Sequence, residues 1–258
     1  MYYIKFVFLF IPFIIMFVLT APVKAEPDWS YSGETGPNFW GDLDSAYQTC
    51  SKGANQSPIN IDTTNVIRNA KLKLGNIQFH YKPSHLTLTN NGKTIVAVPD
   101  KQENTLLIGN EKYFLKQLHF HHQSEHELDH KKFPLEIHFV HKNKKGEIVV
   151  VGVFVEEGTS NTASKKLFES LPQKKGSKKV LKEDVNLLNL LPKDRSLYMY
   201  DGSLTTPPCT EDVKWLLFKE QIEISTELIK EFADLYPANY RPLQNLNDRK
   251  VYFIKDKE

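Results

Sequence analysis

Two stretches decide the fold: residues 117–121, Gln-Leu-His-Phe-His, and residues 135–140, Leu-Glu-Ile-His-Phe-Val. In both, polar and apolar side chains alternate, which is typical of a β-strand whose two faces have different surroundings. Side chains two apart on a strand point to the same face, so His119 and His121 project together, about 7 Å apart along the strand. The connection is long enough to reverse the chain, and antiparallel pairing would bring His138 to that face.

The same alternation extends to the sequence on either side. Residues 85–89 and 94–98 flank the turn-forming run Asn90-Asn91-Gly92 and predict a β-hairpin. Further strands are predicted at residues 105–108, 113–121, 135–141, 148–155, 197–200 and 213–218, and helices at residues 164–171 and 226–234. No linker, repeat or low-complexity tract interrupts the pattern. We therefore predict a mostly β fold with a few short peripheral helices and a single domain.

The first 25 residues indicate a secretory signal peptide. Lys5 supplies a positive start, residues 6–19 are an apolar run, and small residues precede a cleavage point after Ala25. That run is short for a spanning helix, which needs roughly 20 residues. The alternative is an uncleaved anchor helix. We predict a signal peptide at residues 1–25 and an exported domain, periplasmic or secreted, at residues 26–258.

Composition and charge exclude several classes of protein. The chain has 258 residues, of which 40% are hydrophobic and 25% charged, as in soluble globular proteins. It has 33 basic and 31 acidic residues, and the signal segment contains Lys5 and Lys24 but no acid, so the remaining charges balance. A neutral body argues against nucleic acid as a partner and against general attraction to anionic membranes.

If the domain is exported, the oxidation state of its two cysteines, Cys50 and Cys209, can be predicted. They are too far apart in sequence for a Cys-x-x-Cys redox or zinc motif. In an oxidising compartment we expect one disulfide closing a loop of roughly 160 residues, which would stabilise the fold by about 5 kcal/mol on the chain-entropy model. Two buried free thiols are the alternative.

Seven of the nine histidines fall between His119 and His141. Such crowding would be repulsive if every ring were charged, so we expect neutral, liganded or hydrogen-bonded rings. Three imidazoles with one open position are the pattern of a catalytic zinc site. A structural zinc site would normally have a fourth protein ligand, usually cysteine, and none lies nearby in the sequence.

Other histidines offer a rival interpretation. His122, His126 and His130 stand four residues apart, as in a helical metal pair, but the charged residues around them favour a solvated turn. His141 lies an odd number of positions from His138 and should face the opposite side of the strand, as a core histidine.

Six motifs occur in one order between about Trp29 and Val251. They are Gln56-Ser57-Pro58-Ile59, Gln117-Leu-His119-Phe-His121, Ser124-Glu125-His126, Glu136-Ile-His138-Phe-Val-His141, Ser203-Leu-Thr205-Thr206-Pro207-Pro208 and Asn239-Tyr-Arg241-Pro242. Together they resemble the motifs of the α-class carbonic anhydrases of the bacterial, exported type. The positions of the two cysteines are similar to those of the disulfide in extracellular members. The resemblance implies a large, twisted, mainly antiparallel sheet with Zn²⁺ at the bottom of a conical cleft.

The resemblance also implies roles for particular residues. His119, His121 and His138 would be the zinc ligands. Gln117 and Glu136 would hold the free ring N–H groups and so set the tautomer and basicity of the ligands.

The nucleophile and the substrate would have their own neighbours. The resemblance implies that the Thr205 hydroxyl accepts a hydrogen bond from zinc-bound hydroxide and passes its own proton to Glu125, which orients a lone pair at the incoming carbon. The apolar wall where carbon dioxide rests would be formed by Val140, Val150, Leu204 and Trp215, with Thr206 beside it.

The reaction implied is the zinc-dependent, reversible hydration of carbon dioxide to bicarbonate and a proton, with ester hydrolysis as a side activity. The substrate is a small molecule, and no stable membrane anchor is expected. Two other classes remain open: a binding module that keeps the fold without the chemistry, and a zinc-scavenging protein that uses the whole histidine cluster.

Lys93 is a departure from the family pattern. It follows the turn at a position where the family often has a histidine that carries protons between zinc-bound water and solvent. An unperturbed lysine has a pKa near 10.4, whereas histidine's is near 6.5, so a lysine would rarely be free to accept a proton at neutral pH. We therefore predict that proton transfer limits turnover.

Overall fold

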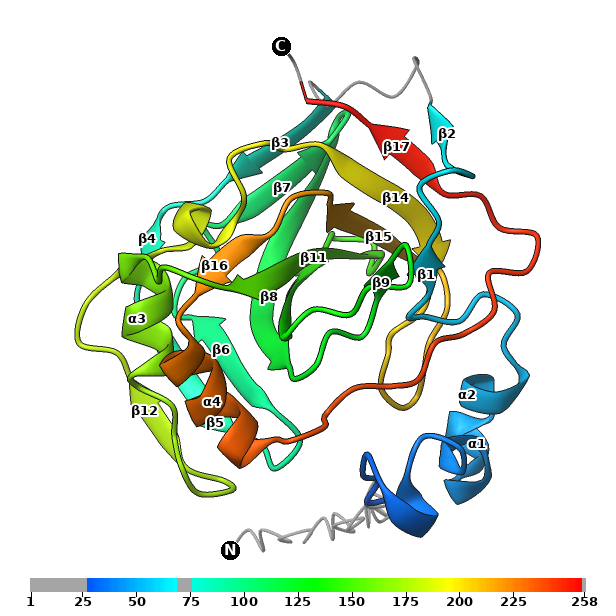
Figure 1. Ribbon diagram of the computed structural model, residues 1–258, viewed down its shortest axis with the longest axis horizontal. Coiled ribbons are helices and arrows are strands. Elements are labelled where there is room, and N and C mark those ends of the chain that lie inside the picture. The colour runs from blue at the N-terminus through cyan, green and yellow to red at the C-terminus, as the bar shows by residue number, and fades with distance from the viewer. Residues whose placement is uncertain (1–26, 69–75, 257–258) are drawn as a thin grey trace, which may run out of the picture.

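The computed structural model describes residues 27–68 and 76–256 (Figure 1). The predicted signal peptide lies outside the described residues, so its prediction stays untested. Among the residues described, no helix has both the length and the apolar character needed to cross a membrane.

A large mixed sheet forms the body of the molecule (Figure 1). In the described part of the chain it contains 13 strands, and the main path runs in the order β12-β5-β6-β8-β10-β11-β15-β14-β17-β2. The path strands are β12 (Lys178–Val180), β5 (Leu86–Asn90), β6 (Ile95–Pro99), β8 (Glu111–His121), β10 (Leu135–Lys142), β11 (Ile148–Glu157), β15 (Val213–Phe218), β14 (Leu197–Gly202), β17 (Tyr252–Ile254) and β2 (Ile67–Arg68). Off this path, β16 (Ile222–Ile224) pairs with β11, and β7 (Thr105–Ile108) joins β3 (Ile77–His80) to β8.

The remaining elements are short. Two small sheets pair β1 (Asn60–Ile61) with β9 (Glu127–Leu128) and β13 (Val185–Asn186) with β4 (Pro83–Ser84). The helices are α1 (Trp40–Leu43), α2 (Thr49–Lys52), α3 (Thr162–Phe168) and α4 (Thr226–Leu235), with 3-10 turns at Gly33–Thr35, Ser45–Tyr47 and Leu187–Leu190.

The predicted fold class is confirmed: strands dominate and the helices are few and short. Both predicted helices occur, although α3 begins and ends a few residues before its predicted bounds. The large sheet is mainly antiparallel, and within its described strands three ladders are parallel: β11 with β15, β11 with β16, and β17 with β2. Residue patterns predict strands, but they do not say which strand pairs with which.

The register of β8 against β10 gives the sheet two different faces. His138 pairs with His119 and Glu136 with His121, so the polar residues of both strands share one face. The opposite face carries Phe120 and its apolar neighbours, which join the main hydrophobic core. One face therefore builds the core and the other presents the histidines.

Helices α3 and α4 cover the core face (Figure 1). Phe120 contacts Phe168 of α3 and Phe232 of α4, with ring centroids 5.0 and 5.8 Å apart. Helix α4 buries Leu228, Ile229 and Phe232 on one side, as an amphipathic helix does. Each fully buried ring or aliphatic side chain contributes roughly 1.5–3 kcal/mol.

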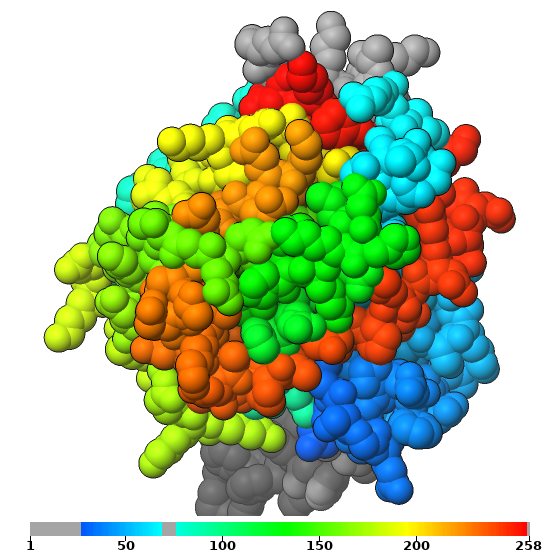
Figure 2. All heavy atoms as spheres, viewed as in Figure 1, coloured from blue at the N-terminus to red at the C-terminus, as the bar shows by residue number. Residues whose placement is uncertain are grey.

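The N-terminal residues form a separate aromatic cluster beside the sheet. Trp40 is fully buried, and its ring centroid lies 5.2 Å from that of Trp29 and 5.9 Å from that of Tyr31. Figure 2 shows this N-terminal part, in blue, against the orange-red segment that follows α4. Residues 31–39 and 238–242 line a hollow of about 280 Å³ between the two.

A candidate metal centre on the sheet

Three imidazoles converge on the polar face of the sheet. His119 and His121 come from β8 and His138 from β10, and one nitrogen atom of each lies within 4.8 Å of the others. The ring centroids are 5.0 Å apart for His119 and His121, 5.2 Å for His119 and His138, and 4.6 Å for His121 and His138. The sequence therefore predicted correctly that these three rings meet.

On each ring, the nitrogen that points away from the other two rings donates its N–H to a protein oxygen. His119 Nδ1 lies 2.9 Å from Gln117 Oε1, and His138 Nε2 lies 2.7 Å from Glu136 Oε1. His121 Nδ1 lies 2.6 Å from the main-chain oxygen of Asn239. Because these oxygens accept, the bonded nitrogens carry the protons. The lone pairs of His119 Nε2, His121 Nε2 and His138 Nδ1 therefore remain available to a metal ion.

The donor set fits a divalent transition metal. His121 Nε2 is buried and has no hydrogen-bond partner among the described residues, a costly state for a polar atom unless it is a ligand. Three imidazole donors suit zinc and leave a tetrahedral position open. No protein side chain with a suitable ligand atom, within the described residues, adds a fourth member to this group.

A second group of possible ligands is already occupied. His126, Glu136 and His138 also lie close enough to hold an ion. However, Glu136 Oε1 lies 2.8 Å from His126 Nδ1 and 2.7 Å from His138 Nε2, so these atoms satisfy one another. The geometry favours the three-histidine group.

Burial favours the neutral form of two of the three rings, His119 and His121. It lowers the pKa of His119 well below its usual value, and the nearby rings of His121 and His138 lower it further. Burial likewise lowers the pKa of His121, against the opposing charge of Glu125. Neutral imidazole is the form that binds a metal, so both rings stay competent below the pH at which a free histidine protonates.

Glu136 is buried and yet ionised. Burial alone would raise its pKa, but the charges and hydrogen bonds of His126 and His138 outweigh that effect and hold the pKa well below its usual range. Its Oε2 accepts from the main-chain N–H groups of Glu125 and His126, each at 2.9 Å. All of these donors together explain how a carboxylate remains in the core.

Glu125 faces the histidines. Its Oε1 accepts from the main-chain N–H of Arg241 at 2.8 Å. Its Oε2 lies 3.5 Å from His121 Nε2 and 3.9 Å from His138 Nδ1. Thr205 is buried in the loop after β14, but no hydrogen bond joins it to Glu125 in the described structure. The hydrogen bond implied by the resemblance is therefore not present among the described residues, and Glu125 Oε2 has no hydrogen-bond partner there.

The predicted apolar wall lies next to the rings. Val140, Val150 and Trp215 occupy one row across β10, β11 and β15, because Val140 pairs with Val150 and Val150 with Trp215. The Trp215 ring lies 4.8 Å from that of His138. Leu204 packs against the same cluster, and Thr206 follows in the adjoining loop, where its main-chain oxygen accepts from Cys209 N at 2.8 Å.

A buried polar network behind the rings was not predicted. His126 Nε2 lies 2.6 Å from Tyr200 Oη, which lies 2.7 Å from Ser57 Oγ. The sequence interpretation placed His126 in a solvated turn, which is wrong: its side chain is fully buried. Asp129 and Lys131, after β9, are exposed, so the solvated turn that their charges indicate begins only after His126. The helical rival is also wrong, since this stretch contains no helix.

Two residues near the C-terminus were also missed. Asn239 supplies the oxygen that holds His121, and the main-chain N–H of Arg241 holds Glu125. The Arg241 guanidinium is buried and donates to Gln56 Oε1, Ser57 O and Cys50 O. The only signal in the sequence was the motif of residues 239–242, which assigned no role to either residue.

The two cysteines form a disulfide, with Cα atoms 5.0 Å apart and 159 positions between them in sequence. The bond ties helix α2 to the loop that contains Thr205. His141 faces the core, as predicted, where its Nε2 lies 2.7 Å from Tyr81 Oη.

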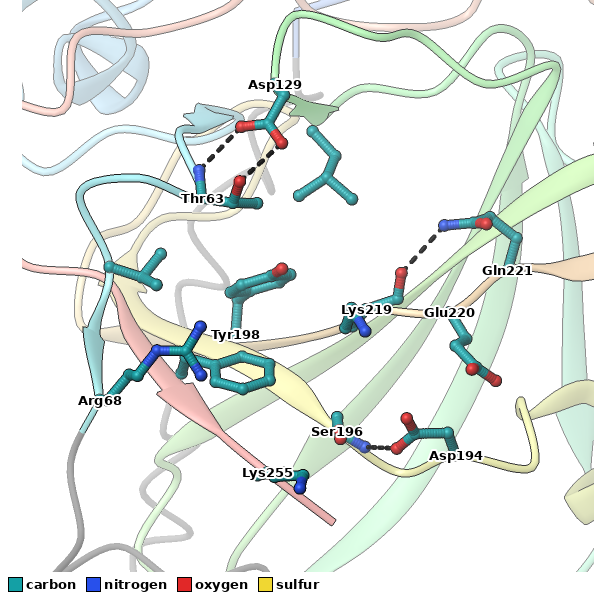
Figure 3. A pocket seen from close by; sticks show the side chains of 13 residues that line it. Thr63, Arg68, Asp129, Asp194, Ser196, Tyr198, Lys219, Glu220, Gln221 and Lys255 are labelled. Atoms are coloured by element: carbon teal, nitrogen blue, oxygen red, sulfur yellow. Dashed lines mark hydrogen bonds between the residues drawn. The ribbon is translucent and has the colours of Figure 1, made fainter.

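A separate cavity of about 650 Å³ lies away from the histidines (Figure 3). Its apolar side includes Tyr198 and Phe253, with the Arg68 guanidinium 5.2 Å from the Phe253 ring centroid. Asp129, on its rim, accepts two hydrogen bonds from Thr63, at 2.8 and 2.7 Å. None of the candidate site residues lines this cavity, so it is distinct from the metal centre.

Comparison with known proteins agrees with this geometry. Residues 35–255 match the family model described as eukaryotic-type carbonic anhydrase. A carbonic anhydrase of Nostoc sp. is 37% identical over 236 residues, which cover 90% of this chain and 89% of the relative. One from Klebsiella pneumoniae is 39% identical over 225 residues, covering 86% and 89%.

A solved structure agrees as well. The α-carbonic anhydrase of Thermovibrio ammonificans, in complex with the inhibitor sulfanilamide, superimposes with a TM-score of 0.84 and is 39% identical, covering 88% of this chain and 99% of that one. The match of fold, sequence and family model over nearly the whole described chain means that it belongs to the eukaryotic-type, or α, carbonic anhydrases, the enzymes that hydrate carbon dioxide.

Proposed function

We propose that the chain hydrates carbon dioxide with a Zn²⁺ ion held by His119, His121 and His138. The observation that carries the proposal is the set of three ring nitrogens within 4.8 Å of one another, each on a ring whose other nitrogen is held by a protein oxygen. When bound, Zn²⁺ acts as a Lewis acid and brings the pKa of a coordinated water near 7, which supplies a nucleophile at neutral pH.

The protein residues orient the reactants. Gln117, Glu136 and the Asn239 carbonyl fix the three rings before any ion arrives, which reduces the cost of assembling the site. Glu125 places a carboxylate oxygen beside the rings, 3.5 Å from His121 Nε2. Thr205 is buried in the loop after β14. In our proposal the Thr205 hydroxyl turns to donate to Glu125, so that it can only accept from the attacking oxygen.

The apolar wall holds the substrate. Carbon dioxide has no charge and few hydrogen-bonding options, so Val140, Val150, Leu204 and Trp215, with Thr206 beside them, provide a suitable surface next to the rings. An activated ester presents a similar acyl carbon, which would explain a side esterase activity.

The test is stopped-flow hydration of carbon dioxide by the zinc-loaded protein, with and without a chelator. We expect His119→Ala to lose both zinc and activity, whereas His130→Ala, which removes an exposed ring outside the group, should keep both. Since a structural relative binds sulfanilamide, we expect that compound to inhibit this chain. A His119→Ala variant with full activity would falsify the proposal.

Metal stoichiometry separates the enzyme from a zinc-scavenging protein. One Zn²⁺ per chain, measured by mass spectrometry under native conditions, is expected here. Several ions per chain, with no hydration activity, would favour the scavenger.

We also propose that the protein is exported to the periplasm or secreted. Its disulfide supports this, because such bonds persist in oxidising compartments. Fractionation of the native cells, with an antibody against the protein, tests the location, and a cytoplasmic signal would contradict it.

A further inference from the structure

The Lys93 ammonium makes a three-point contact with the N-terminal segment, residues 28–31. It lies 2.9 Å from Asp28 Oδ1, donates to the main-chain oxygen of Trp29, and sits 4.9 Å from the Trp29 ring centroid. Its side chain is only 19% exposed, whereas that of Asp28 is 83% exposed. An ammonium carries three donors and a full charge, so one side chain can serve carboxylate, carbonyl and ring face together.

The main chain of Lys93 is attached to the metal centre. Its carbonyl accepts from Asn239 Nδ2 at 3.1 Å. The carbonyl of the same asparagine accepts from His121 Nδ1 at 2.6 Å. Lys93 therefore lies between the N-terminal segment and the group that orients one of the three rings.

The N-terminal segment reaches the site by a second path. Trp29 packs on Trp40, with ring centroids 5.2 Å apart, and the Arg241 guanidinium lies 5.8 Å from the Trp40 ring. The main-chain N–H of Arg241 in turn holds Glu125. Tyr31, in the same segment, has its pKa raised by burial and by the charge of Glu125, which agrees with a position near that carboxylate.

We propose that Lys93 is a positioning residue: its ammonium clamps residues 28–31 against the turn between β5 and β6, so that this segment forms a fixed wall of the site beside Glu125. In this role Lys93 holds structure and carries no proton. An isolated exposed ion pair contributes little to stability, but here the carbonyl and ring contacts act on the same group.

Hydrogen–deuterium exchange in the zinc-loaded protein tests the clamp directly. Lys93→Met keeps an unbranched side chain of similar length but removes the charge. In this variant, amide exchange at residues 28–35 should be about tenfold faster than in the unmodified protein. Lys93→Arg keeps a cation and should restore slow exchange. Exchange in β10 and β11 should stay unchanged in both, which shows that the fold is intact.

Lys175→Met is the matched control. Lys175 also lowers the pKa of Asp28 by its charge and packs against Gly92 of the same turn, but it donates no hydrogen bond to residues 28–31 in the described structure. We expect its exchange to match that of the unmodified protein. Equal loosening in Lys175→Met and Lys93→Met, or none in Lys93→Met, would overturn the clamp.

Kinetics provide a second readout, which rests on the proposed function. Proton transfer to buffer follows bicarbonate release, so it affects kcat alone, whereas a loosened wall affects kcat/KM. We expect kcat/KM of Lys93→Met to fall about threefold, with rescue by Lys93→Arg. A fall in kcat alone would instead make Lys93 part of proton transfer. If the proposed function failed, no variant would be active, yet the exchange result would still decide the clamp.

Discussion

Glu136 Oε1 lies 2.7 Å from His138 Nε2, and this contact determines which nitrogen of His138 faces the other two rings. On His119 and His121 the free nitrogen is Nε2, whereas on His138 it is Nδ1, because the carboxylate holds the opposite atom. A single buried carboxylate therefore selects the tautomer of one candidate ligand.

Glu136→Gln tests this selection. The amide has one oxygen for four donors, so it can no longer accept from both the imidazoles and the main-chain N–H groups. We expect zinc affinity to fall about 10- to 100-fold, measured by competition with a chelator. Glu156→Gln, a partly exposed position on β11, should leave the affinity as it was. Unchanged zinc binding in Glu136→Gln would show that the carboxylate does not set the tautomer.

Proton transfer should limit turnover, because Lys93 occupies the position where a histidine would carry the proton, and its ammonium is held by residues 28–31. Adding imidazole buffer should raise kcat, since imidazole has a pKa near neutrality. Lys93→His should raise kcat in dilute buffer for the same reason, measured by stopped-flow hydration. If neither change alters kcat, another group already carries the proton.

His141 should make stability depend on pH. Burial lowers its pKa from 6.5 to about 4. As pH falls below 6.5 the unfolded chain binds a proton at this ring while the folded chain does not, so the unfolded state is favoured. Stability should fall by about 3 kcal/mol between pH 6.5 and 4 through this residue.

The His141→Gln variant checks that pH dependence. Glutamine can still bond to Tyr81 Oη but does not titrate, so urea unfolding at a series of pH values should give a shallower slope. His80→Gln, at an exposed position, should leave the slope unaltered. Equal slopes for all three proteins would contradict the assignment to His141.

The disulfide should stabilise the fold without forming the metal centre. Replacing both Cys50 and Cys209 by serine releases a loop of 159 positions, and the chain-entropy model gives a loss of about 5 kcal/mol. Urea unfolding measures that loss. Zinc content at neutral pH should be retained, since neither cysteine belongs to the three-histidine group. Loss of zinc from the folded double variant would be inconsistent with this division.

Local alternation was sufficient to predict the strands that carry the site. It put His119 and His121 on one face and turned His141 to the core, which follows from the two-residue period of a strand. The approach of His138 required in addition the assumption that its strand pairs antiparallel with the first, as β10 and β8 do. Which residues form the apolar wall was predicted only from the resemblance. That Val140, Val150 and Trp215 lie side by side follows from the register of β10, β11 and β15.

Contacts between segments that lie far apart in the sequence could not be predicted from local alternation. The oxygen that holds His121 belongs to the main chain of Asn239, and any residue type could have supplied a carbonyl. The burial of His126 depends on Tyr200, 74 positions away, and the contacts of Lys93 depend on where the N-terminal segment packs. A local pattern carries no information on such partners.

The bond from His121 to Asn239 spans 118 positions, which has a consequence for biosynthesis. A nascent chain that has emerged only as far as β11 already contains all three histidines, but the carbonyl that orients one ring has yet to be made. On the proposed function, tight capture of an ion would therefore wait until nearly the whole polypeptide has been made, and we expect a protein truncated before residue 239 to contain all three histidines and still bind metal poorly.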